Sequence, residues 1–224
     1  MPRKKFDTTL LPLAPDLNFE QGLWQAGVGV IAGVDEAGRG ALAGPVAAGV
    51  VALPNQPDLL ELLSGVRDSK QMTAKTRQHW AKQIKAVTEV WQVGFAEPGE
   101  IDEIGIVPAT RLAAMRAIAL LPQAPEHLLI DAISIPRAGL PETSLIKGDR
   151  RCLSIAAASI LAKVQRDAYM IRINEQYPQY GFAAHKGYGT AQHRAAIDLY
   201  GPCPIHRMSF SPLRPDESDQ LALF

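Results

Sequence analysis

The sequence predicts an α/β fold in which a mixed β-sheet is flanked by helices. Short apolar runs rich in Val, Ile and Ala alternate with longer segments of helical periodicity along the 224 residues. Acidic residues fall at or just after the ends of three of these runs, and the carboxyl ends of strands are where open α/β sheets bind ligands. The length suits one large domain, and 47% apolar residues suffice to build its core.

Strands and helices are expected in alternation along most of the chain. The expected strands are five short runs, over residues 28–35, 45–53, 89–96, 127–133 and 143–149. The expected helices are four longer segments, over residues 73–87, 98–122, 150–177 and 190–201. A Gly/Ala/Pro loop between the first two strands predicts a hairpin. Thr73 is the expected N-cap of the first helix, Pro108 is expected to break the second, and Gly201 is expected to end the last.

The formal net charge is zero, but the charges are unevenly distributed. Lys and Arg outnumber Asp and Glu over residues 137–214, whereas acidic residues dominate residues 89–131. This pattern fits a groove for a polyanion beside a cation site, and it equally fits chance clustering on a solvated surface. The two cysteines, Cys152 and Cys203, form no C-x-x-C pair, which argues against a zinc site and a disulfide framework and favours a cytoplasmic protein.

The N-terminal segment carries basic residues but lacks the apolar run of a signal peptide, and no apolar stretch is long enough to span a membrane. Residues 1–20 have no clear periodicity, and we expect them to form a loosely attached arm. The predicted organisation is an N-terminal extension over residues 1–27, one domain over residues 28–213 and a flexible tail over residues 214–224.

Four carboxylates are the candidate chemical groups. Asp35 and Glu36 end the first predicted strand. Because adjacent strand residues point to opposite faces, both can reach one site only where the strand ends and the backbone turns. Asp131 ends a run that should be buried on both faces, where a carboxylate is costly unless it is paired or coordinated. Asp149 lies just before the longest predicted helix.

Two of these acids also have purely structural interpretations. Asp131 could cap the next element, or it could form a salt bridge with Arg137 or Lys147. Asp149 could be an ordinary helix N-cap. The sequence alone leaves these alternatives open.

Four acids brought together would repel one another and could not all remain ionised without cations. Hard divalent ions take oxygen ligands, and Mg²⁺ and Mn²⁺ suit carboxylate sites best. Two such ions about 4 Å apart, holding the attacking and leaving oxygens, would give phosphodiester hydrolysis. The predicted metal ligands and catalytic residues are therefore Asp35, Glu36, Asp131 and Asp149.

Two glycine-containing segments are candidate substrate contacts. Gly38, Arg39 and Gly40 directly follow the first two acids. Glycines let a backbone approach a ligand closely, and an arginine between them can bind phosphate or hydroxyl groups. The segment His-Lys-Gly-Tyr-Gly-Thr, residues 185–190, offers Tyr188 for stacking on a base or sugar. The alternatives are a plain tight turn and a surface loop with a packed tyrosine, and neither segment has a dinucleotide-binding or P-loop motif.

Taken together, these segments resemble the ribonuclease HII family, also called type 2 ribonuclease H. The matching stretches over residues 28–213 are, in order, AGVDEAGRGALAGPV, DSK, EIDEIGI, LLID, KGD, SIAAASILAKVQRD, YPQYGFAAHKGYGT and GPCPIHRMSF. The resemblance implies a ribonuclease-H-like mixed five-stranded sheet flanked by helices, with a C-terminal helical portion. It also implies an endonuclease that hydrolyses RNA in RNA–DNA hybrids and cuts 5′ to a single ribonucleotide embedded in duplex DNA.

The resemblance assigns roles to individual residues. The family's four acidic ligands for two Mg²⁺ or Mn²⁺ ions map onto Asp35, Glu36, Asp131 and Asp149. Its motif that contacts the 2′-hydroxyl, its stacking tyrosine and its phosphate-side lysines map onto Gly38, Arg39, Gly40, Tyr188, Lys70 and Lys147. Hydrolysis would leave a 3′-hydroxyl and a 5′-phosphate. Ala41 and Ala132 depart from the pattern, which usually has proline and glycine at these positions.

The last five residues, Gln-Leu-Ala-Leu-Phe, follow an acidic segment. They are similar to the peptide Gln-Leu-x-Leu-Phe by which bacterial replication and repair proteins bind the sliding clamp. Apolar side chains at a terminus favour a docking peptide, whose contacts would be Gln220, Leu221, Leu223 and Phe224. The alternative is a tail that folds back onto its own domain. No membrane partner is expected, and the protein is expected to be a monomer.

Two other functions remain open from the sequence. One is another two-metal nuclease of the same fold, such as a type 1 ribonuclease H or a resolvase, although the Gly-Arg-Gly and Lys-Gly-Tyr-Gly-Thr segments argue against it. The other is a catalytically silent protein that binds hybrids or the clamp. That function would require a missing acidic ligand, and all four acids are present.

Overall fold

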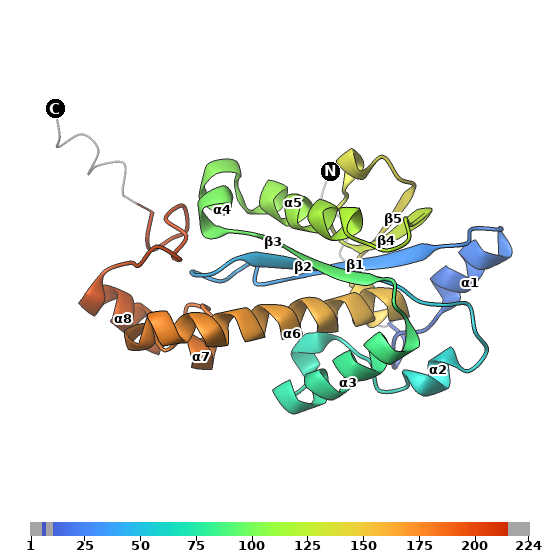
Figure 1. Ribbon diagram of the computed structural model, residues 1–224, viewed down its shortest axis with the longest axis horizontal. Helices are drawn as coiled ribbons and strands as arrows, with labels where there is room; N and C mark the ends of the chain where they lie inside the picture. Colours follow the sequence, from blue (N-terminus) through green and yellow to red (C-terminus); the bar gives the residue numbers. More distant parts are fainter. Residues whose placement is uncertain (1–5, 8–10, 215–224) are drawn as a thin grey trace.

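Five strands form one mixed sheet at the centre of the protein (Figure 1). The computed structural model describes residues 6–7 and 11–214. Its strands are β1 (Ile31–Ala37), β2 (Val46–Ala52), β3 (Trp91–Ala96), β4 (His127–Asp131) and β5 (Glu142–Leu145). They lie in the order β3-β2-β1-β4-β5, with β1, β2 and β3 antiparallel and with β4 and β5 parallel to β1. The predicted mixed sheet and the predicted β1–β2 hairpin are confirmed.

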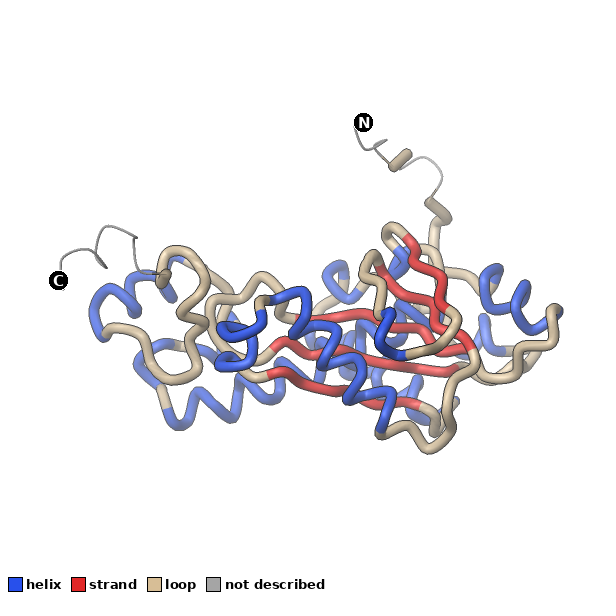
Figure 2. The backbone as a smooth tube through the Cα atoms, turned by 90° about the horizontal axis from the view of Figure 1, so that it is seen from above, coloured by secondary structure: helices blue, strands red, loops and turns tan. Residues whose placement is uncertain are grey.

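Helices cover both faces of this sheet (Figures 1 and 2). The helices are α1 (Asn18–Gln25), α2 (Leu59–Leu62), α3 (Ala74–Val87), α4 (Pro98–Ile104), α5 (Ile106–Ala119), α6 (Leu153–Gln176), α7 (Phe182–His185) and α8 (Ala191–Tyr200). Short 3₁₀ turns are η2 (Ser69–Gln71), η3 (Pro136–Ala138), η4 (Gly148–Arg150) and η5 (Pro178–Tyr180). The helices α4 and α5 pack on one face, whereas α6 and α3 pack on the other. None of the helices in the described part of the chain has the length and apolarity that crossing a bilayer requires.

The long helix α6 lies unusually close to the sheet because glycines of β1 and β2 face it. A Cβ atom on Gly33 would lie 2.1 Å from the backbone carbon of Ser154, and one on Gly49 would lie 2.3 Å from the carbonyl oxygen of Ala158. The α6 residues at this contact are small and fully buried. The close packing fixes the N-terminal half of α6 against β1, the strand that carries the first two acids.

Helix caps agree with the sequence in two places and differ in one. The Oγ1 atom of Thr73 accepts a hydrogen bond from the amide of Thr76 at 3.2 Å, which confirms the predicted N-cap of α3. Gly201 ends α8 with a φ of 72°. The predicted break at Pro108 is wrong: the break falls at Gly105, whose φ of 81° separates α4 from α5. Pro108 lies in the first turn of α5, where its missing N–H costs nothing.

Two other predicted boundaries are wrong. The first strand does not end at its acids, because β1 continues to Ala37 and β2 pairs with it from Ala32 to Ala37. The N-terminal arm is not loosely attached over residues 16–20. Leu17 and Glu20 are buried, and the backbone of Asp16 exchanges hydrogen bonds with Arg151 and Leu153. A long-range contact of this kind leaves no local periodicity in the sequence.

Candidate active site

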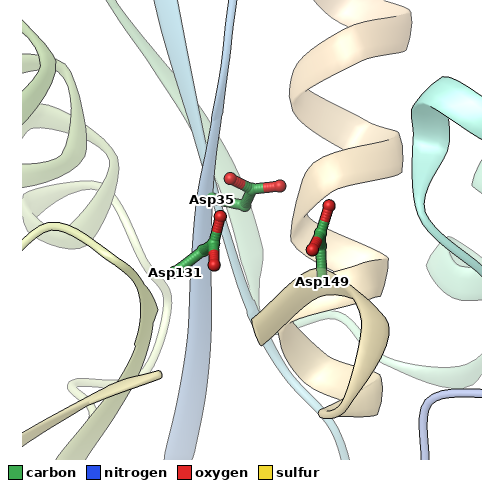
Figure 3. Close-up of side chains that lie close together, drawn as sticks. All are labelled: Asp35, Asp131 and Asp149. Carbon is green, nitrogen blue, oxygen red and sulfur yellow. The ribbon is translucent and has the colours of Figure 1, made fainter. Parts of the chain in front are cut away.

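Three aspartates meet at one end of the parallel strands (Figure 3). Val34 of β1 pairs with Ile130 of β4, so the next residue on each strand, Asp35 and Asp131, lies at the same level of the sheet. Asp149 approaches from η4, the turn that precedes α6. One carboxylate oxygen from each aspartate lies within 4.8 Å of the others. The structure thus brings together three of the four acids that were predicted to share one site.

Asp35 is the most deeply buried of the three, with 3% of its surface exposed. Its Oδ1 atom accepts a hydrogen bond from the amide of Glu36 at 2.7 Å, whereas Oδ2 is buried without a hydrogen-bond partner among the described residues. Burial and the charges of Glu36 and Asp131 raise the pKa of Asp35 well above its ordinary value. An orphaned carboxylate oxygen in such surroundings calls for a cation or a proton.

Asp131 and Asp149 occupy less enclosed positions. Asp131 accepts a hydrogen bond from the amide of Gly148 at 2.7 Å, which ties the end of β4 to η4. Burial raises the pKa of Asp131, and burial together with the charge of Asp131 raises the pKa of Asp149 to about 6. The N-cap of α6 is Cys152, so the alternative interpretation of Asp149 as the N-cap of this helix is wrong. The aspartates thus fit a divalent cation, which would pair the orphaned oxygen and offset their repulsion.

The side chain of Glu36 leaves the backbone on the face of the sheet opposite to that of Asp35. Because strand residues alternate, Asp35 shares the α6-facing side with Gly33, whereas Glu36 shares the α5-facing side with Val34. Its carboxylate lies 3.6 Å from the guanidinium of Arg39, and it is not one of the three clustered acids. Burial raises its pKa, with Arg39 opposing and the charge of Asp131 adding to the shift. Its role as a metal ligand stays a prediction.

The two lysines lie differently with respect to the cluster. Lys70 is largely exposed, and its Nζ atom lies 3.8 Å from a carboxylate oxygen of Asp149. Burial by itself would lower the pKa of Lys70. The negative charges of Asp35 and Asp149 outweigh this effect, so the pKa is raised. Lys147 precedes η4 in a left-handed conformation with a φ of 55°. Among the described residues it forms no ion pair with Asp131, contrary to one structural alternative.

The Gly-Arg-Gly loop, residues 38–45, lies against the 185–190 loop. The amides of Leu42 and Ala43 donate to the carbonyl of Gly187 at 2.8 and 3.3 Å. A Cβ atom on Gly40 would meet no atom within 4 Å, so the backbone there faces open space. Tyr188 is half-buried, with the charged groups of Lys163 and Arg166 at 5.1 and 5.4 Å from its ring centre. The structure therefore places the two predicted substrate-contacting segments on one surface.

A groove beside Tyr188 carries further charges that the sequence prediction did not include. It is lined by residues of α3, α6 and the 184–188 segment, among them Arg77, Lys163 and Lys186. Asp167 pairs with Lys163 at 2.8 Å and with Arg77 at 3.5 Å, which holds both cations in place. Gln220, Leu221, Leu223 and Phe224, the predicted clamp contacts, lie outside the described residues.

Comparisons with known proteins agree with this arrangement. A sequence model of the family described as ribonuclease HII matches residues 32–212. Ribonuclease HII of Chloroflexus aurantiacus is 49% identical over 205 residues, which cover 90% of this chain and 95% of that protein. Ribonuclease H2 from Pyrococcus horikoshii OT3 has a similar structure, with a TM-score of 0.69, 28% identity, and coverage of 83% of this chain and 95% of that one.

A third relative was solved together with a partner. Ribonuclease HII from Archaeoglobus fulgidus, in a complex with PCNA, has a TM-score of 0.68 at 28% identity and covers 85% of this chain and 99% of its own. The family match spans the sheet, the acidic cluster and the C-terminal helices alike. The chain therefore belongs to the ribonuclease HII family and is a nuclease that hydrolyses RNA in RNA–DNA hybrids.

Proposed function

We propose that this enzyme also cuts duplex DNA 5′ to a single embedded ribonucleotide, leaving a 3′-hydroxyl and a 5′-phosphate. The observation that carries the proposal is the position of the acidic cluster. Asp35, one of the three clustered aspartates, lies on β1, the strand that leads directly into the Gly-Arg-Gly loop. A reacting phosphate at the carboxylates would thus place the neighbouring sugar at the loop, without needing a long run of RNA.

The acidic side chains would hold divalent cations. Asp35, Asp131 and Asp149 offer clustered oxygens, and Glu36 is the proposed fourth ligand, reached by a change of its side-chain conformation away from Arg39. Mg²⁺ or Mn²⁺ ions, two in the working complex, would supply an activated water and stabilise the leaving oxygen. The exposed ammonium group of Lys70 beside Asp149 would contact the phosphate from the solvent side. Lys147 is proposed as a second, weaker phosphate contact.

Two features favour recognition of a ribose. The open space beside Gly40 lets a sugar come against the backbone, and the half-exposed guanidinium of Arg39 can donate to a 2′-hydroxyl. Tyr188 is positioned to stack on the adjoining sugar, with the basic groove beside it for the phosphates. All of these groups act on one nucleotide and its neighbour.

The test is a cleavage assay with three substrates. They are duplex DNA with one ribonucleotide, a continuous RNA–DNA hybrid and an all-deoxy duplex, each with Mg²⁺ or Mn²⁺ and with EDTA as the control. We expect cleavage of the first two, at the 5′ side of the ribonucleotide in the first, and none with EDTA. Cleavage of the hybrid alone would contradict the single-ribonucleotide proposal, and end-labelling would check the 3′-hydroxyl and 5′-phosphate products.

We also propose that the tail binds a sliding clamp. The last five residues match a clamp-binding peptide, and the Archaeoglobus relative was solved in a complex with PCNA. In a pull-down with a bacterial clamp, deletion of residues 220–224 should abolish binding without lowering cleavage of short substrates. A full-length chain that binds no clamp, or a truncated chain that binds equally well, would refute the proposal.

A further inference from the structure

Two buried arginines lie behind the substrate-contacting loops. Arg166 of α6 and Arg207, which follows α8, are both 0% exposed. Among the described residues neither forms an ion pair. Burial lowers the pKa of both, that of Arg207 to about 9, and the charge of Arg166 adds to the effect on Arg207. Burying two positive charges without an ion-pair partner destabilises the folded state, so hydrogen bonds to both guanidinium groups must compensate for the loss of water.

Within the described part of the chain, Arg207 donates only to carbonyls of the Gly-Arg-Gly loop and its exit. Its Nη2 atom donates to Gly38 at 2.8 Å, and its Nη1 atom donates to Arg39 at 3.0 Å. Its Nε atom donates to the carbonyl of Gly44 at 2.9 Å. The guanidinium thus binds carbonyls at both the beginning and the end of the loop.

Arg166 joins this loop to the 185–190 loop, called the tyrosine loop because it carries Tyr188. Its Nε and Nη2 atoms donate to the carbonyls of Pro45 and Ala43 at 2.8 and 3.0 Å. Its Nη1 atom donates to the carbonyl of Lys186, two residues before Tyr188, at 3.0 Å. One planar group therefore contacts both loops.

The conformation of Gly38 is matched to Arg166. Gly38 has a φ of 86°, and a Cβ atom there would lie 1.8 Å from the Nε atom of Arg166. Glycine at this position is thus required by the buried arginine, whereas glycine at position 40 faces open space. The two glycines of the motif therefore have different roles. Gly38 leaves the space that Arg166 occupies, and Gly40 leaves open space for a ligand.

We propose that Arg166 and Arg207 are positioning residues that set the selectivity for a ribose over a deoxyribose. They hold residues 38–45 and 186–188 in one arrangement, so that Arg39 and Tyr188 meet the same nucleotide. This inference rests on the proposed recognition of single ribonucleotides. Lysine cannot replace either residue, because it presents a single point charge where the arginine presents donors in a rigid plane.

The binding experiment compares the wild type with Arg207→Lys and Arg166→Lys. Fluorescence anisotropy in EDTA measures the affinity for duplex DNA with one ribonucleotide and for an all-deoxy duplex of the same sequence. We expect both variants to lose the preference for the ribonucleotide by about tenfold or more, because small displacements of positioned groups cost this much. The affinity for the all-deoxy duplex should remain. Arg116→Lys is the control, since the guanidinium of Arg116 on α5 donates to the carbonyl of Phe95 and to the carboxylate of Glu100, which belong to neither loop.

A second measurement works without substrate. Hydrogen exchange of the Leu42 and Ala43 amides, both bonded to Gly187, reports whether the two loops stay joined. Exchange there should accelerate in Arg166→Lys and stay unchanged in Arg116→Lys. Gly38→Ala, which pushes on Arg166 from the other side, should give the same result if a lysine variant fails to fold.

The two measurements separate the possible failures. If the wild type shows no preference for the ribonucleotide, the proposed function is wrong, and the exchange data still decide whether the arginines join the loops. If Arg166→Lys and Gly38→Ala both keep the wild-type preference and the wild-type exchange rates, the positioning role is overturned.

Discussion

Glu20 of α1 accepts a hydrogen bond from the backbone amide of Ser154, in the first turn of α6, at 2.9 Å. The same Oε1 atom lies 3.1 Å from the sulfur of Cys152, the N-cap residue, whose own side chain makes no capping bond. An element far away in the sequence thus caps the helix that follows Asp149. The N-terminal segment is part of the enzyme's fold and supports one side of its acidic cluster.

Two substitutions of Glu20 should distinguish the contribution of its hydrogen bond to stability from the contribution of its charge. Glu20→Ala removes the acceptor and should lower the free energy of unfolding by about 1–3 kcal/mol, the usual cost of an unsatisfied buried donor. Glu20→Gln keeps an acceptor and should be at least as stable as the wild type at pH 7. Urea unfolding measures both. Equal losses in the two variants would show that the ionised carboxylate itself is required.

The pH dependence of this pair of variants has a defined sign. Burial raises the pKa of Glu20 above its ordinary value of 4.5. A carboxyl group with a raised folded-state pKa stabilises the fold fully below pH 4.5, and this contribution is lost as the pH rises through the folded-state pKa. The advantage of Glu20→Gln over the wild type should therefore grow between pH 4.5 and pH 7. A constant difference across this range would contradict the burial effect.

Much of the molecule could be predicted from the sequence, for local reasons. The strands, the α6 helix and the caps at Thr73 and Gly201 depend on residue patterns within one element. Asp131 was identifiable because a carboxylate that ends an apolar strand is costly unless it has a function. These features carry their physical cause in adjacent residues.

Other features depend on partners distant in sequence and could not be predicted. β1 continues past Asp35 and Glu36 because β2 returns to pair with it, so the two acids face opposite sides of the sheet. Arg166 and Arg207 bind carbonyls of a loop more than a hundred residues earlier, and a carbonyl has no sequence signature. The signal that was available is chemical: arginine within an otherwise buried helix requires acceptors.

Asp131→Asn tests the acidic cluster. The substitution removes one charge from three carboxylates within 4.8 Å, so it should abolish cleavage in Mg²⁺ or Mn²⁺ while binding of the hybrid survives. In EDTA the variant should be at least as stable as the wild type, because a repulsive charge has been removed. Calorimetric titration with Mn²⁺ and thermal unfolding in EDTA check both statements. Near-normal turnover would refute the metal-site assignment.

Alanine at three glycines should separate folding from recognition. Gly33→Ala would place a Cβ atom 2.1 Å from the backbone of α6 and should destabilise the protein by about 3 kcal/mol or more. Gly40→Ala meets nothing within 4 Å and should leave the melting temperature nearly unchanged, yet lower cleavage of the single-ribonucleotide duplex. Gly22→Ala, also in open space but inside helix α1, is the control: it should raise the melting temperature slightly, because alanine favours a helix over glycine, and should leave cleavage unchanged. Full activity of Gly40→Ala would show that substrate does not approach there.

Ala132 gives a prediction that follows from backbone strain. This residue, directly after Asp131, has a φ of 55°, in the left-handed region that disfavours a Cβ atom. Its side chain is exposed and gains nothing from packing. Ala132→Gly should therefore raise the free energy of unfolding by about 0.5–1 kcal/mol, with Ala138→Gly in η3 as a control that lowers it. A loss of stability in Ala132→Gly would show that alanine at this position stabilises the loop by restricting the unfolded chain.

His193 and His206, which lie beside the tyrosine loop, should make the stability of this part of the fold fall at acidic pH. The amide of Cys203 donates to Nδ1 of His206, so the Nε2–H of His206 points at Nε2 of His193, 3.1 Å away. The Nδ1–H of His193 in turn donates to the carbonyl of Tyr188 at 3.0 Å. Both rings are therefore neutral, and a proton on the Nε2 lone pair of His193 would set two N–H groups against each other.

Burial, with the neighbouring histidines, lowers the pKa of His193 to about 4, against an ordinary value of 6.5. A histidine with a lowered folded-state pKa stabilises the fold fully above pH 6.5. That contribution is lost as the pH falls towards 4, because only the unfolded chain takes up the proton. His193→Gln should be less stable than the wild type at pH 7 but should lose less stability between pH 6.5 and pH 4. Urea unfolding across this range checks the slope. An unchanged slope in His193→Gln would mean that the acid sensitivity arises elsewhere.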